Sequence, residues 1–105
     1  MFKIITLCGS IKFKEEFLKI QEKFTLEGYI VLTPIFFPNL KKELLTEEVK
    51  TMLAKMHKQK IAMSDLVIIV NVRGYLGEST KEEIRYAQEK AKKVIYYTDL
   101  IKSKQ

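Results

Sequence analysis

The sequence predicts an α/β fold, a small flavodoxin-like or Rossmann-like three-layer sandwich with a four- to five-stranded parallel sheet. Strand-like and helix-like segments alternate along the chain, which is typical of parallel strands joined by helical crossovers. The apolar run 66–70 is unbroken, as expected for a strand that helices bury on both faces. Directly after the first apolar run, Gly9-Ser10 indicates a tight turn into a helix.

Four segments have the β-branched and aromatic composition of strands. The first predicted helix lies between the first and second of these segments, and the second helix lies between the second and third. The first helix has apolar residues at helical spacing and ends at Gly28. Thr46 is positioned to cap the second helix, which begins after a proline-flanked loop or lid over 34–45. The predicted strands are 2–7, 29–33, 66–70 and 94–97, followed by a short polar tail over 98–105. The predicted inward-facing residues are Phe13, Phe17, Ile20 and Phe24 in the first helix, and Val49, Leu53 and Met56 in the second.

A third helix is predicted to open within residues 79–83. Two pairs there, Ser79 with Glu82 and Thr80 with Glu83, have the spacing of a capping box. The capping interpretation therefore competes with a functional one for both glutamates, because acids in a first turn also serve the helix dipole.

Composition is that of one soluble globular domain covering 1–105. Hydrophobic residues make up 47% and charged residues 30%, and no apolar run approaches the roughly 18–20 residues that span a bilayer. A single cysteine, Cys8, excludes an intrachain disulfide and fits a reducing cytoplasm, where we expect the protein to work. With one Cys and one His in the chain, no zinc or other metal site is expected.

The net charge of +6 is spread over all helices and interleaved with 13 acids. Scattered lysines are typical of solvated helix faces, so nucleic acid is not the expected partner. Anionic small molecules such as nucleotides would still be attracted.

Ligands of such sheets bind beyond the carboxyl ends of the strands, near the switch in strand order. Three segments should meet there, namely 8–12, 34–45 and 73–83. The Gly9-Ser10 turn offers backbone N–H groups and a hydroxyl to an anion, although a plain strand-to-helix turn explains it equally well. By residue type alone, Cys8 is expected to be a buried small hydrophobe with no activating His nearby, and His57 an exposed polar residue. Asp65 is expected to bridge the turn from helix to strand.

Three motifs in this order resemble the nucleoside 2-deoxyribosyltransferase family, including its branch that hydrolyses 2'-deoxynucleoside 5'-monophosphates. Cys8-Gly9-Ser10-Ile11 followed by Lys12 resembles the opening motif of the hydrolase branch. Residues 64–70 are similar to the family's third strand, which begins after an Asp. Glu83-Ile84-Arg85-Tyr86-Ala87 resembles the signature whose Glu is the nucleophile.

The resemblance implies that Glu83 attacks C1' of a deoxyribose and that no cofactor is needed. It places Cys8, Gly9, Ser10 and Ile11 at the sugar-phosphate end, with the remaining ligand contacts on the third helix. Those contacts are Gly77, Ser79 and Thr80.

Four positions depart from the family pattern. Thr6 stands where a Tyr is usual, Gly77 where the hydrolases have a phosphate-binding Ser, and Arg85 where the signature has Gly. His57 stands where the catalytic Asp is expected and is the candidate proton donor.

Two functions follow as alternatives. The first is N-glycosidic bond cleavage or transfer on a deoxynucleoside or its monophosphate, and the second is a non-catalytic module that binds a nucleotide or sugar phosphate. A nucleic-acid-binding or interaction domain is a weaker third. Because family members build their sites with a neighbouring subunit, the resemblance also implies a homodimer or larger homo-oligomer, with Ile35-Phe36-Phe37 partly covered in it.

Overall fold

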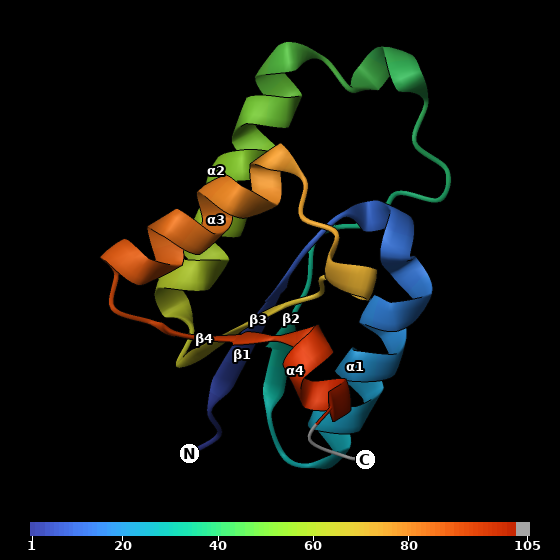
Figure 1. Cartoon of the computed structure of the whole chain (residues 1–105). Helices are drawn as coiled ribbons and strands as arrows, with labels where there is room; N and C mark the ends of the chain where they lie inside the picture. The colour runs from blue at the N-terminus through green and yellow to red at the C-terminus, as the bar shows by residue number, and fades with distance from the viewer. Residues whose placement is uncertain (103–105) are drawn as a thin grey trace.

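The computed structural model describes residues 1–102 and has the predicted α/β architecture, with one all-parallel four-stranded sheet (Figure 1). The strand order is β2-β1-β3-β4, so the chain reverses its direction of travel across the sheet between β1 and β3. That reversal is the topological switch point at which doubly wound sheets bind ligands. The strands are β1 (Ile4–Cys8), β2 (Ile30–Leu32), β3 (Leu66–Ile69) and β4 (Lys93–Tyr96).

Helices cover both faces of the sheet. In Figure 1, α1 and α4 lie on one face and α2 and α3 on the other. The helices are α1 (Lys14–Leu26), α2 (Glu47–Met63), α3 (Glu78–Glu89) and α4 (Tyr97–Lys102), with short 3-10 turns η1 (Ile11–Phe13), η2 (Lys42–Leu44) and η3 (Val72–Gly74). The fourth strand ends at Tyr96, one residue before its predicted end, and the tail prediction is wrong for 98–102, which belong to α4; 103–105 lie outside the described residues.

Strand alternation divides the core into two layers. Ile5 and Leu7 pack with Phe17 of α1 on one face of the sheet, together with Phe13 and Ile20. Cys8 of β1 faces the other way and packs with Ile61 of α2 and Ile84 of α3. The predicted buried residues of the first helix are therefore confirmed, with Phe24 partly buried beside them.

The buried face of α2 differs from the prediction. Met56 is 51% exposed, whereas His57 is only 7% exposed and Ile61 fully buried. His57 follows Leu53 and precedes Ile61 by four residues each, so these three lie on one helix face and Met56 is rotated off it. The expectation of an exposed His57 is wrong because helical phase, and not polarity, decides which side of α2 meets the sheet.

Local signals at the helix ends are partly confirmed. The Thr46 hydroxyl accepts a hydrogen bond from the amide of Val49 at 3.2 Å, as predicted for an N-cap. Both capping boxes are wrong, because α3 begins at Glu78 after Gly77 and has no side-chain cap. Ser79 and Thr80 therefore lie within the first turn of α3.

Asp65, directly before β3, is bonded to β1 and not across the helix-to-strand turn predicted for it. Its backbone amide donates to the carbonyl oxygen of Ile4, and its carboxylate accepts from the Ile4 amide, both at 2.8 Å. Nearby, the buried Thr6 hydroxyl contacts Ser64 and donates to the carbonyl oxygen of Lys60. Thr6 thus ties β1 to the C-terminal turn of α2, a structural role that does not place it in a ligand site.

Gly9 directly follows β1, and its backbone lies close to Val70, the residue that follows β3. A Cβ at this position would lie 2.8 Å from the carbonyl oxygen of Val70 and 3.2 Å from the Phe17 ring. Only glycine fits without moving the strand, which fixes the path of the chain into Ser10.

We predict that Gly9→Ala lowers the free energy of unfolding by about 1–3 kcal/mol, the usual cost of an overpacked site. Gly77→Ala is the matched control, because its φ is −79° and its Cβ would meet only Tyr75 at 3.7 Å. We expect it to cost less than about 1 kcal/mol. Urea denaturation measures both, and equal losses would contradict the close-approach account.

Candidate functional site

A cleft of about 580 Å³ opens at the carboxyl ends of β1 and β3, the predicted position. It is bounded by the Gly9–Ile11 turn, the 34–45 loop, α2 and the first turn of α3. Every predicted site residue except Cys8 lines it: Gly9, Ser10, Ile11, His57, Gly77, Ser79, Thr80 and Glu83. The sequence thus predicted which segments converge, because parallel strands all present their carboxyl ends at one edge of the sheet.

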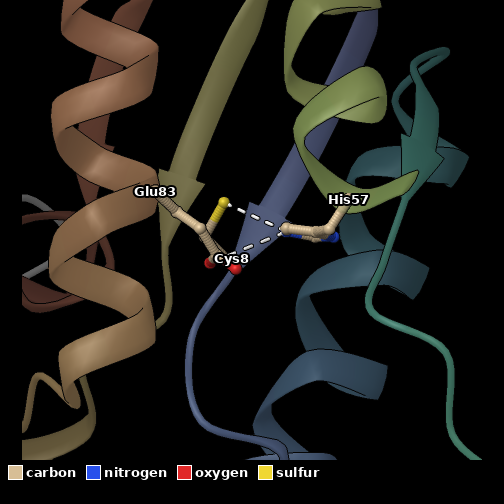
Figure 2. A group of neighbouring side chains, drawn as sticks. All are labelled: Cys8, His57 and Glu83. Carbon is tan, nitrogen blue, oxygen red and sulfur yellow. Dashed lines mark hydrogen bonds and ion pairs between the residues drawn. The ribbon is translucent and has the colours of Figure 1, made fainter. Parts of the chain in front are cut away.

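Glu83, His57 and Cys8 form one cluster under this cleft (Figure 2). Figure 2 shows Glu83 reaching from α3 and His57 from α2 toward each other above the end of β1, which carries Cys8. The Cys8 sulfur lies 3.3 Å from His57 Nε2, and His57 Nε2 lies 3.8 Å from Glu83 Oε1. Cys8 is buried as predicted, but the prediction that no His lies near it is wrong.

The protonation of this cluster is set mainly by burial. Burial, assisted by the positive charge of Lys60, lowers the pKa of His57 to about 4. Burial also raises the pKa of Glu83 to about 7, and raises that of the Cys8 thiol well above its ordinary value, with the Glu83 carboxylate adding to the effect on Cys8. His57 is therefore neutral near neutral pH, and its contact with Glu83 is not an ion pair there.

This finding changes the role available to His57. The proton-donor hypothesis required a group that titrates near neutrality, and a ring with a pKa of about 4 carries no second proton to give. His57 Nδ1 is buried and has no hydrogen-bond partner within the described residues. Its other nitrogen lies 3.3 Å from the Cys8 sulfur and 3.8 Å from Glu83 Oε1, so His57 packs beside the Glu83 carboxylate and does not protonate a leaving group.

Several cleft residues were not singled out individually in the sequence, although some lie in the segments predicted to meet at the site. Lys50 and Lys60 come from α2, and the Lys60 ammonium donates to the carbonyl oxygen of Thr33 at 2.8 Å. Burial lowers the pKa of Lys60. The apolar wall of the cleft is formed by Ile35, Phe37, Leu45, Leu53, Met56 and Tyr75. Helical phase and the path of the loop decide which side chains of these segments enter the cleft.

Arg85 does not enter the cleft. Its side chain is 66% exposed and lies 3.7 Å from the carboxylate of Glu82, on the outer side of α3. Arg85, which replaces the signature Gly, therefore leaves the pocket unfilled, because residues 83 and 85 point in different directions on a helix. Glu82 is exposed with it, so only Glu83 of the adjacent pair reaches the site.

No protein-family model matches the sequence, and no curated protein matches it. Within residues 1–102 the structure also contains no helix of the length and apolarity that a membrane crossing requires. Function must therefore be inferred from the residues of the cleft.

The pKa shifts of His57 and Glu83 predict opposite effects of pH on stability. Between pH 4 and 6.5 the unfolded His57 binds a proton that the folded one does not, so its contribution to stability falls as the pH falls through this range. Between pH 4.5 and 7 the folded Glu83 holds a proton that the unfolded one has lost, so its contribution falls as the pH rises.

We predict that single variants separate the two effects. Glu83→Gln, which keeps only the His57 effect, should lose stability as the pH falls from 6.5 to 4, and His57→Gln, which keeps only the Glu83 effect, should lose it as the pH rises from 4.5 to 7. Urea unfolding of chelator-treated protein across this range measures both. Because His57 is the only histidine, its ring NMR signals should titrate near pH 4, and a midpoint near 6.5 would contradict its burial.

Proposed function

We propose that the protein cleaves or transfers the N-glycosidic bond of a deoxynucleoside or deoxynucleoside monophosphate, with Glu83 as the nucleophile. The observation that carries this proposal is the position of the Glu83 carboxylate, 19% exposed at the floor of the cleft. The motif resemblance assigns the same residue on independent grounds, since it rests on the sequence around Glu83 and not on the cleft.

The polar and apolar residues that line the cleft suit the two ends of such a substrate. The Gly9-Ser10 turn and the first turn of α3, with Ser79 and Thr80, present hydroxyl and backbone N–H groups to the sugar-phosphate end. Lys50 and Lys60 add positive charge. The apolar wall, with the Tyr75 ring, suits the flat face of a base.

The chemistry would run through a covalent intermediate. A Glu83 carboxylate oxygen bonds to C1' while the C1'–N bond breaks, and its electron pair leaves with the base. The departing base takes a proton from solvent in the open cleft, because His57 is neutral. Water or a second base then attacks C1', frees the sugar and returns the carboxylate.

An alternative function, binding without turnover, is favoured by one observation. The family's acid is replaced by a His whose pKa is too low to supply a proton. Loss of the proton donor slows glycosidic cleavage but leaves binding intact.

We predict that wild-type protein releases free base from at least one deoxynucleoside or deoxynucleotide, measured by chromatography, and that release rises with pH through about 7 as Glu83 ionises. Glu83→Gln should reduce the rate by on the order of 10³ or more, because the amide cannot attack C1'. Glu82→Gln, one residue away on the exposed side of α3, is the matched control and should keep the rate. Thermal stabilisation by a nucleotide without base release would establish the binding module instead.

We also infer that the protein forms a homodimer that covers the rim of the cleft. Ile35, Phe37 and Met56 line the cleft yet remain about half exposed, and Met52 is exposed one turn before Met56 on α2. Figure 1 shows η2 and the N-terminal end of α2 extending beyond the sheet, where they have no helix against them. A partner subunit on this side would shield the apolar surface and close the cleft from solvent.

We predict a dimer mass in light scattering at micromolar concentration, and a monomer mass for Met56→Glu, which places a charge in the covered surface. Leu26→Glu is the control, because Leu26 is also exposed but lies at the far end of α1. A wild-type monomer at every concentration tested would exclude the dimer.

A further inference from the structure

We propose that Cys8, His57 and Glu83 form a binding site for a thiophilic divalent cation of the Zn²⁺ class. One thiol, one imidazole nitrogen and one carboxylate converge, and their ligating atoms all lie within 4.8 Å of one another. Sulfur, nitrogen and oxygen ligands of this kind are those that Zn²⁺ binds in proteins. The sequence alone did not indicate this site, because its three ligands come from three separate elements, β1, α2 and α3.

The distances fit tetrahedral coordination. Ligands at about 2.0–2.3 Å from a zinc ion lie about 3.3–3.8 Å from one another. The Cys8 sulfur and His57 Nε2 are 3.3 Å apart, and His57 Nε2 and Glu83 Oε1 are 3.8 Å apart. Two of the three distances between ligand atoms therefore already have the required length, and the third, between Cys8 and Glu83, is within 4.8 Å.

The cleft provides both the entry path and the fourth coordination position. His57 and Glu83 line the cleft, while Cys8 lies beneath them and is fully buried. A metal with three protein ligands and one position open to water or ligand is the arrangement of an accessible zinc site, as opposed to a closed structural one. Binding displaces the thiol proton, because a coordinating thiol is deprotonated outright.

The surroundings indicate exchangeable binding. A metal-ligating His normally donates its other ring N–H to an acceptor, and such outer-shell partners are worth about 10–100-fold in affinity. His57 Nδ1 has no such partner among the described residues. The site should therefore take up and release the metal reversibly. If the proposed function holds, the bound metal occupies the nucleophile and inhibits the enzyme.

The test is titration of the purified, chelator-stripped full chain with Co²⁺ and Zn²⁺. Co²⁺ should bind one equivalent and give a thiolate-to-metal charge-transfer band, which can arise only from Cys8 because the chain has one cysteine. Zn²⁺ should displace it. Cys8→Ser should abolish the band, and Glu83→Gln should weaken Zn²⁺ binding at least about tenfold, whereas Glu82→Gln should bind like wild type.

Thermal unfolding shows which variants remain folded. If Cys8→Ser does not fold, because Cys8 is fully buried, Glu83→Gln still tests the site, since Glu83 is partly exposed. Absence of the charge-transfer band in wild type, or equal Zn²⁺ affinity in Glu83→Gln and Glu82→Gln, would overturn the proposal. These readouts do not depend on activity. If stripped protein releases no base, the proposed function fails while the cobalt spectrum still decides the metal site.

Discussion

The pairing of β1 with β3 at the centre of the sheet is the constraint on which the rest of the structure depends. Cys8 is paired with Ile69, so both strands end at the same level and their exits diverge from a shared point. Gly9 keeps its backbone within van der Waals range of Val70 there, which no larger residue permits. The crevice over these two strand ends holds the cleft, and α2 and α3 reach it because both cover the same face of the sheet.

Burial governs the chemistry of the cluster. Three titratable side chains that lie against one another occupy a space where charge is poorly solvated, so each shifts toward its neutral form. Near neutral pH His57 is neutral and Glu83 is about half ionised, so Glu83 carries the charge of the cluster there. The charge state of such a site can change, because a substrate, a proton or a metal ion can each alter which of the three groups is charged.

The extension of α2 beyond the sheet explains the shape of the cleft. The molecule measures 44 × 27 × 27 Å, and Figure 1 shows the N-terminal half of α2 and η2 standing apart from the sheet. Leu45, between η2 and α2, and Leu53 of α2 line the cleft. Met56, further along α2, lines the cleft and also belongs to the surface that our proposal assigns to subunit contact.

The sequence by itself determined the architecture, the order of the elements and the segments that meet at the site. Apolar runs such as 66–70, the Thr46 cap and the Gly9-Ser10 turn are local signals. Such signals can be recognised in a sequence without knowing which residues contact one another. Because the strands are parallel, their carboxyl ends lie at the same edge of the sheet. Gly9, Ser10 and Glu83 could therefore be placed in one site.

Only the tertiary structure decided how the side chains are used. Residue type predicted an exposed His57 and an isolated Cys8, yet the phase of α2 turns His57 inward to within 3.3 Å of the Cys8 sulfur. The shifted pKa values of His57 and Glu83 follow from that burial and cannot be read from identity alone. Helical phase likewise sends Glu82 and Arg85 to solvent while Glu83 enters the cleft. A contact between residues 49 positions apart depends on packing, which no local pattern encodes.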